Sequence, residues 1–198
     1  MDYDELLIEE FRHWKLDLPT GVRQKLADYA SQLEQWNKAV NLTALQGIRL
    51  VRRLIVEPIW VGHRLQMSGK LMDVGSGNGS PGIPLAITSN FEHVLLVEPR
   101  LKRTAFLRHV IAKLMLRNTE VARERVENLQ VGLSPPDWIT LQAIDPNEDI
   151  ILSLKKLSME TTRVVWLTSR DHPPIPAAEK IELPESSNKI WIFRLDQS

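Results

Sequence analysis

A glycine-rich segment that directly follows a short apolar run constrains the fold of this chain more than any other feature. Residues 71–74 form the apolar run, and glycine then recurs at alternate positions, at Gly75, Gly77 and Gly79. Glycine lets the backbone turn sharply and lets a ligand lie directly against peptide groups, because no Cβ stands in the way. The segment therefore predicts a strand that ends at a ligand-binding turn.

Short apolar runs alternate with helical patterns from residue 70 onward. The runs are too short and too uniformly apolar for surface helices, and such runs are typical of strands buried on both faces of a parallel sheet. We expect strands at 71–74, 93–98, 119–122, 138–141, 164–168 and 190–193, helices at 83–87 and 101–116, and loops at 132–137 and 171–176. The alternation implies right-handed crossovers and a doubly wound, mostly parallel sheet, which is an α/β fold of the Rossmann-like kind.

The first 65 residues show helical periodicity only. Apolar residues recur in steps of three and four over residues 22–40, with Thr20 as the expected N-cap and Asn41 at the end of the stripe. A second helical pattern covers residues 48–65. We therefore expect two parts, an N-terminal helical extension at 1–66 and a sheet-containing core at 67–198.

The composition excludes several classes of site and location. The chain has no cysteine, which excludes disulfide scaffolds, zinc fingers, iron–sulfur clusters and thiol nucleophiles. Its five histidines share no short ligand spacing, so we expect no metal site. The acidic start lacks the pattern of a signal peptide, and no apolar stretch approaches the roughly 18 residues of a spanning helix. We therefore expect a protein of the cytoplasm with no membrane partner.

A carboxylate at the end of the second apolar run indicates an adenosine-type cofactor. Glu98 stands nineteen residues past Gly79, where it can accept both hydroxyl hydrogens of a ribose diol. The loop also fits the dinucleotide pattern, but Pro81 and Pro84 remove two N–H donors that a pyrophosphate needs. S-adenosylmethionine needs no phosphate site, and Asp73 could supply a negative field near its ammonium group. No Gly-Lys-Ser/Thr closes the loop, which disfavours nucleoside triphosphates. The sequence thus favours S-adenosylmethionine over NAD.

The formal net charge is zero, yet the middle of the chain is basic. Residues 44–125 hold 13 basic and 6 acidic residues, whereas the segments before and after are net acidic. The basic residues come in clusters, among them Arg52 with Arg53 and Lys102 with Arg103. A single cluster often does no more than solvate a helix face, but several together are typical of a surface that binds a phosphate backbone. We expect these four residues to contact a polyanion.

Four motifs occur together between residues 30 and 130. They are Trp-Asn-Lys-Ala-Val-Asn-Leu-Thr at 36–43, Asp-Val-Gly-Ser-Gly at 73–77, Pro-Gly-Ile-Pro-Leu at 81–85, and Lys-Arg with Phe-Leu-Arg at 102–108. In this combination they resemble the glucose-inhibited division protein B family, bacterial methyltransferases that act on guanine N7 of small-subunit ribosomal RNA. The resemblance implies a Rossmann-like S-adenosylmethionine-dependent methyltransferase fold with appended N-terminal helices. It also implies ribosomal RNA or the small ribosomal subunit as the partner.

The expected cofactor contacts combine the glycine-rich loop with positions that the resemblance adds. They are Asp73, Gly75, Ser76, Gly77, Gly79, Ser80, Glu98, Val126, Glu127 and Gln142. Val126 and Glu127 lie in Arg-Val-Glu at 125–127, which is similar to a family element after the third strand. The sulfonium is already activated, and guanine N7 carries a lone pair and no proton. We therefore expect no obligatory catalytic residue.

Three departures from the family pattern leave the methyl acceptor open. The second helical region lacks the family's His and Asp-Ser, Gln142 stands where the family has Arg, and Leu-Thr-Ser at 167–169 replaces Leu-Lys-Gly. Two alternatives therefore remain beside an active RNA methyltransferase: a divergent S-adenosylmethionine- or RNA-binding protein with little turnover, and a methyltransferase for another acceptor. If the missing guanidinium slows the reaction, Gln142→Arg is expected to raise methylation of small-subunit RNA.

Overall fold

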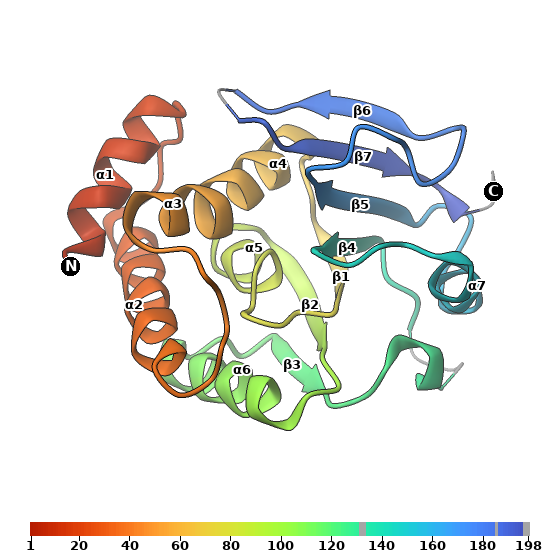
Figure 1. The fold of residues 1–198 in the computed structure, drawn as a ribbon, viewed down its shortest axis with the longest axis horizontal. Helices are drawn as coiled ribbons and strands as arrows, with labels where there is room; N and C mark the ends of the chain where they lie inside the picture. The colour runs from red at the N-terminus through yellow and green to blue at the C-terminus, as the bar shows by residue number, and fades with distance from the viewer. Residues whose placement is uncertain (131–133, 185, 196–198) are drawn as a thin grey trace.

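A seven-stranded sheet forms the centre of the computed structural model, which describes residues 1–130, 134–184 and 186–195 (Figure 1). The strands are β1 Gly69–Val74, β2 Phe91–Val97, β3 Thr119–Ala122, β4 Trp138–Gln142, β5 Arg163–Thr168, β6 Glu179–Glu182 and β7 Lys189–Phe193. Their order is β3-β2-β1-β4-β5-β7-β6. Strands β1 to β5 pair in parallel, and β7 runs antiparallel to both β5 and β6. The predicted α/β fold with a doubly wound, mostly parallel sheet is confirmed.

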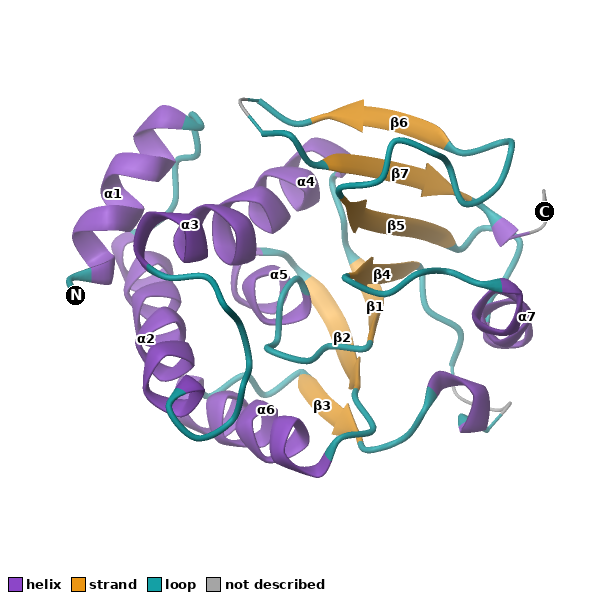
Figure 2. Ribbon diagram, in the orientation of Figure 1, coloured by secondary structure: helices purple, strands orange, loops and turns teal. Residues whose placement is uncertain are grey.

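Helices cover both faces of this sheet (Figure 2). The α-helices are α1 Tyr3–His13, α2 Thr20–Asn37, α3 Gly47–Val51, α4 Glu57–Leu65, α5 Gly82–Thr88, α6 Leu101–Leu114 and α7 Glu148–Leu157. A π-helical turn, η1 Arg52–Val56, joins α3 to α4, and a 3₁₀ turn, η2 Val126–Asn128, follows β3. Alternate side chains of β1 enter the two cores: Leu71 packs on the side of α1 to α6, and Met72 packs on the side of α7. Strands β1, β2, β4, β5 and β7 are buried over most of both faces, which explains their continuous apolar runs.

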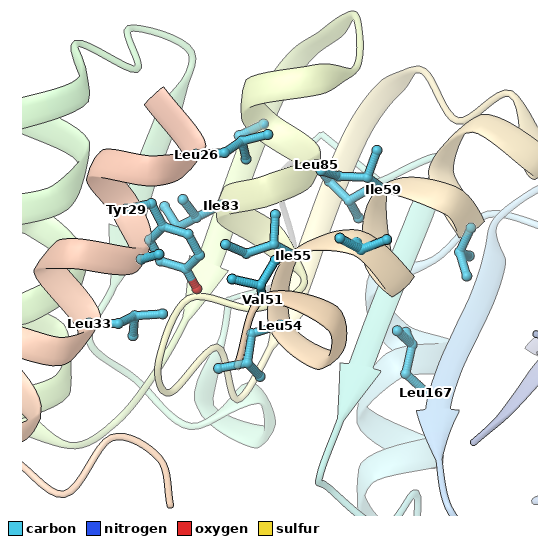
Figure 3. Close-up of a cluster of buried hydrophobic side chains, with 14 of the residues drawn as sticks. Leu26, Tyr29, Leu33, Val51, Leu54, Ile55, Ile59, Ile83, Leu85 and Leu167 are labelled. Carbon is cyan, nitrogen blue, oxygen red and sulfur yellow. The ribbon is translucent and has the colours of Figure 1, made fainter. Parts of the chain in front are cut away.

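The N-terminal helices and the sheet share one hydrophobic core. Figure 3 shows Leu26 and Tyr29 of α2 beside Ile83 of α5, with Ile55 of η1 next to them. These four side chains are fully buried, and they belong to the same cluster as Val94 in the middle of β2. The helices before β1 therefore contribute part of the core that the parallel sheet packs against.

The structure corrects the predicted boundaries of the first long helix. Helix α2 begins at Thr20 itself, its N-cap position is Pro19, and no side chain caps it, so the prediction of Thr20 as N-cap is wrong. Proline fixes φ near the value that a helix start needs, so Pro19 can open α2 without a side-chain bond. The helix ends at Asn37 rather than at Asn41, because the Asn37 side chain binds the main chain of residues 42 and 43 instead. The predicted loop at 132–137 begins in residues outside the described ones.

The described residues contain neither a helix suited to a membrane nor a cluster of metal ligands. Among residues 1–130, 134–184 and 186–195, no helix combines the length and the apolar character that crossing a membrane requires. In the same residues, no group of three His, Asp or Glu side chains is arranged to hold a metal ion.

Candidate active site

A cavity of about 550 Å³ opens at the carboxyl ends of β1, β2 and β4. Strands β2 and β4 are the two neighbours of β1 in the sheet, so the chain switches direction across the sheet at this point. Such a switch point is where open α/β sheets bind their ligands. The loop from β1 to α5 forms one wall, and the ends of β2 and β4 form the base. The opposite side is closed by Leu42, Thr43, Leu45, Arg53 and Leu54.

The glycine-rich loop is held in a conformation that requires its glycines. Gly75, Gly77 and Gly79 have φ angles of 70°, 48° and 93°, in the region where other residues are strained. A Cβ on Gly75 would also collide with the side chain of Ile144. The N–H groups of residues 75 and 76 donate to the Val97 carbonyl at 2.8 and 3.0 Å, which ties the loop to the end of β2. The loop therefore presents bare peptide groups to the cavity.

Helix α2 supports this loop from behind. The buried Tyr29 hydroxyl donates to the Asn78 carbonyl at 2.9 Å. A Cβ on Gly79 would come within 3.3 Å of the same hydroxyl and within 2.8 Å of Ile83. The N-terminal region thus fixes the position of the loop, and Gly79 serves this packing rather than the cavity wall.

Glu98 lies at the end of β2 with both carboxylate oxygens engaged. It is 3% exposed; Oε2 accepts from the N–H of Gly77 at 3.0 Å, and Oε1 accepts from the N–H of Arg100 at 2.8 Å. The Arg103 guanidinium stands 4.0 Å away. Each carboxylate oxygen has a second lone pair, so Glu98 can hold the loop and still accept from a ligand hydroxyl.

Asp73 lies beneath the loop rather than at the cavity surface. It is 1% exposed, and its Oδ1 accepts from the Thr140 hydroxyl at 2.7 Å, whereas Oδ2 has no hydrogen-bond partner among the described residues. Burial raises the pKa of this carboxyl to about 6, and the bond from Thr140 opposes the rise only in part. Asp73 can therefore act on a ligand through its electric field but not through a direct contact.

Gln142, at the end of β4, joins the loop to the π-helical turn. Its Oε1 accepts from the Ser80 hydroxyl at 2.8 Å, and its Nε2 donates to the Arg53 carbonyl at 3.5 Å. In the π-helical turn the Glu57 N–H donates to the Arg52 carbonyl. With the same spacing of five residues, the Arg53 carbonyl would accept from the N–H of residue 58. Residue 58 is proline, which has no N–H. The Arg53 carbonyl therefore accepts a hydrogen bond from the Gln142 amide instead.

The two predicted basic clusters each divide into one residue at the cavity and one away from it. Arg53 and Arg103 line the cavity, and the neighbouring Arg100 lines it too. Arg52 instead makes a bidentate pair with Glu10 of α1, at 2.7 and 2.8 Å. Lys102 is exposed outside the cavity. Three guanidinium groups therefore meet at one opening.

The structure brings together most of the predicted cofactor residues. The cavity wall includes Gly75, Ser76, Gly77, Ser80, Glu98 and Gln142. Among the described residues, those predicted but lying outside the wall are Asp73, Gly79, Val126 and Glu127. Val126 packs into the core on the α7 side, and Glu127 is exposed, so their role as cofactor contacts remains a prediction.

Several wall residues were not predicted. Leu42, Thr43, Asn78 and Arg100 line the cavity without having been assigned to the site. The sequence shows Asn37 and residues 42 and 43 within one motif, but the role of this spacing depends on a side-chain contact. Asn37 Oδ1 accepts from the N–H groups of residues 42 and 43 at 2.8 and 3.0 Å, which places these residues at the cavity.

Comparisons with known proteins give a consistent result. A family model described as rRNA small subunit methyltransferase G matches residues 22–180. Ribosomal RNA small subunit methyltransferase G of Helicobacter hepaticus is 31% identical over 179 residues, which cover 89% of this chain and 97% of that protein. The protein of the same name from Pseudomonas syringae pv. tomato is 34% identical over 188 residues, with 94% and 83% covered.

Solved structures of low identity share the fold. The C-terminal domain of precorrin-6Y C5,15-methyltransferase from Rhodobacter capsulatus has a TM-score of 0.54 at 14% identity, covering 79% of this chain and 95% of that one. An RNA methyltransferase from Salinibacter ruber, in complex with S-adenosyl-L-homocysteine, has a TM-score of 0.52 at 17% identity, with 64% and 80% covered. The predicted methyltransferase fold is confirmed. The family match also confirms the resemblance seen in the motifs: the chain belongs to the glucose-inhibited division protein B family, the family of rRNA small subunit methyltransferase G.

Proposed function

We propose that this chain transfers a methyl group from S-adenosylmethionine to guanine N7 of small-subunit ribosomal RNA. The observation that carries the proposal is the cavity itself, in which a glycine loop and a buried carboxylate face three arginines. Membership of a methyltransferase family favours this activity over a binding protein without turnover and over a different acceptor. Ribosomal RNA as the acceptor would place the protein in the cytoplasm.

The residues of the cavity fit S-adenosylmethionine. A volume of about 550 Å³ lies within the roughly 300–1,000 Å³ of small-molecule sites. Glu98 would hold the ribose diol, and the peptide groups at Gly75 and Gly77 would lie against the rest of the cofactor. The helix that follows the loop begins with Pro81 at its N-cap and carries Pro84 in its first turn, so it offers few donors to a pyrophosphate.

The chain's own residues orient the reactants and exclude water. When bound, S-adenosylmethionine supplies a methyl group that is activated by a sulfonium. Ser80 and Gln142 fix the loop against the helical side of the cavity, and Leu42 and Leu54 close that side with apolar surface. Guanine N7 loses no proton when it is methylated, so the site needs orientation rather than a general base.

Calorimetry on the Glu98→Ala variant tests the cofactor assignment. The variant loses two charge-assisted hydrogen bonds to the ribose, each worth about 1.5–3 kcal/mol, so S-adenosylmethionine should bind about 100-fold more weakly or worse. Glu92→Ala, an exposed glutamate on the same strand, is the control and should bind normally. Unchanged affinity in Glu98→Ala, or tighter binding of NAD than of S-adenosylhomocysteine by the parent, would contradict the assignment.

A salt series tests the arginines of the cavity. Arg53→Ala and Arg103→Ala should each weaken RNA binding and reduce the log–log salt slope by about one, because one phosphate contact is lost. Arg52→Ala and Lys102→Ala are matched neighbours outside the cavity wall and should change the slope less. Equal slopes for all four variants would show that the cavity does not select among these cations.

A further inference from the structure

Glu57, the first residue of α4, is an acid in an almost fully enclosed position. It is 2% exposed, and three groups donate to its carboxylate: Asn188 Nδ2 at 2.7 Å, the Ser186 hydroxyl at 2.8 Å and Arg53 Nη1 at 3.3 Å. Burial raises the pKa of this carboxyl, and Arg53 gives the largest opposing effect. A buried acid, even with a half-buried arginine beside it, seldom stabilises a fold more than an apolar side chain of the same volume would. Its presence therefore calls for a role beyond stability.

The pair connects two parts of the molecule that are distant in sequence. Ser186 and Asn188 precede β7, and the Ser186 hydroxyl also accepts from the N–H of Asn188 at 3.1 Å, which ties these two residues together. Asn188 is itself 4% exposed. The hairpin of β6 and β7 thus holds Glu57 in place from the far edge of the sheet, and Glu57 holds Arg53.

Arg53 is the member of this cluster that reaches the cavity. Its side chain is 33% exposed and lines the wall, and in the described structure only Nη1 of its guanidinium is engaged, with Glu57. A guanidinium carries five N–H donors, so the rest of the fork is available to a ligand. Arginine loses about 2 kcal/mol of side-chain entropy when it is ordered, and the bond to Glu57 meets part of this cost before a ligand arrives.

We propose that Glu57 is a positioning residue, which Ser186 and Asn188 hold in place so that Arg53 presents its guanidinium to a phosphate of the acceptor RNA. The proposal rests on the proposed function, because it assigns a role within RNA binding. The neighbouring Arg52 is drawn to Glu10 and away from the cavity, so the two acids give the two adjacent arginines different tasks.

Methylation kinetics with saturating S-adenosylmethionine and varied 16S RNA or small subunits test the proposal. Glu57→Gln, which keeps the shape and removes the charge, and Asn188→Ala, which removes one tether, should each raise the KM for RNA. Arg53→Ala should raise it on the order of tenfold, the lower end of the loss expected for one charged hydrogen bond. The kcat and the affinity for S-adenosylmethionine should stay unchanged in Glu57→Gln and Asn188→Ala, because neither residue lines the cavity.

The double variant separates positioning from a merely structural role. If Glu57 acts through Arg53, Glu57→Gln should add nothing to the KM of Arg53→Ala. Asp4→Asn removes the acid from the Arg23–Asp4 pair between α1 and α2, far from the cavity, and should leave the KM unchanged. The proposal is overturned if Glu57→Gln and Asn188→Ala leave the KM for RNA at the parent value, or if Glu57→Gln raises it equally with and without Arg53.

Failure of the proposed function would look different. In that case the parent would methylate none of the RNA substrates, and every variant would be equally inactive. RNA binding by the same variants across a salt series then decides the inference: Glu57→Gln should reduce the slope in the parent but not in Arg53→Ala. Equal slopes for the parent and Glu57→Gln would reject it.

Discussion

At the scale of single residues, the contacts of Gln142 reverse the expectation drawn from the sequence. The Gln142 amide accepts from the Ser80 hydroxyl and donates to the Arg53 carbonyl. An arginine at this position would have no acceptor for the Ser80 hydroxyl. It would also add a cation to a cavity that Arg53, Arg100 and Arg103 already line. The sequence shows the missing arginine but not the neighbours that occupy its place.

Gln142→Arg should therefore weaken S-adenosylmethionine binding severalfold and leave single-turnover methylation unraised, because Ser80 loses its acceptor. Titration calorimetry and single-turnover kinetics measure the two effects. Gln24→Ala, an exposed glutamine on α2, is the control. A faster single turnover in Gln142→Arg would restore the expectation from the sequence.

Asp73 should make stability depend on pH in a defined window. Its pKa is about 6 in the folded protein against 3.8 for an ordinary aspartate, so the folded state keeps the proton longer than the unfolded chain does. The stabilisation from this group is complete below about pH 4 and is lost as the pH rises through about 6, a change of about 3 kcal/mol.

Asp73→Asn should remove this change, since an amide does not titrate and its oxygen can still accept from Thr140. The free energy of unfolding of parent and variant, measured from pH 4 to pH 7, should differ increasingly in favour of the variant. Two curves that stay parallel over this range would show that Asp73 titrates normally.

At the scale of elements, the strength of the apolar pattern decides which helices and strands can be predicted from the sequence. Strands β1, β2, β4, β5 and β7 are buried over most of both faces, and each is visible in the sequence as a short apolar run. Strand β6 is an edge strand whose only apolar residue is Ile181, so the sequence gives no strand signal there. Helix α7 is not among the expected helices, although the sequence contains a suitable N-cap. Asn147 caps the helix by accepting from the N–H of Ile150 at 3.0 Å.

The site was predictable where one element provides it and unpredictable where several elements meet. The glycine loop and Glu98 follow from β1 and β2 alone. The approach of Arg53 to Gln142 depends on the π-helical turn η1, for which Pro58 is the only visible sequence signal. The apolar stripe over residues 22–40 includes Tyr29 but does not indicate its hydrogen bond to the loop, which depends on how α2 packs.

Tyr29→Phe should show that α2 supports the cofactor loop. The variant loses the hydroxyl that donates to the Asn78 carbonyl, and this should cost about 1 kcal/mol of stability and weaken S-adenosylmethionine binding severalfold. Thermal unfolding and calorimetry measure the two effects. Tyr3→Phe changes the other tyrosine of the chain and should leave cofactor affinity unchanged. If Tyr29→Phe and Tyr3→Phe bind S-adenosylmethionine equally well, α2 does not support the loop.

At the scale of the whole molecule, the expected division into an extension at 1–66 and a core at 67–198 raises the question whether the core can fold without the extension. The core cluster that includes Leu26, Tyr29, Ile55 and Ile59 also includes residues of β1, β2, β5 and β7. Without residues 1–66, one face of the sheet would lose much of its apolar cover. We propose that residues 1–66 precede the sheet in the sequence but fold together with it as one unit.

A fragment of residues 67–198 should therefore fail to fold cooperatively. Far-UV circular dichroism and urea unfolding of the fragment, beside the full chain, measure this. A cooperative transition in the fragment, with its own baseline and midpoint, would make the core an independent domain.

Methyl transfer to a defined acceptor tests the central claim most directly. The full chain is incubated with methyl-labelled S-adenosylmethionine and with intact 30S particles, with total ribosomal RNA or with no acceptor, and the label is mapped to base and atom. We predict labelling of small-subunit RNA at guanine N7, its loss in Glu98→Ala, and no methyl release without acceptor. Transfer to a different atom or molecule, or no transfer to either RNA substrate by a chain that binds S-adenosylmethionine, would contradict the account.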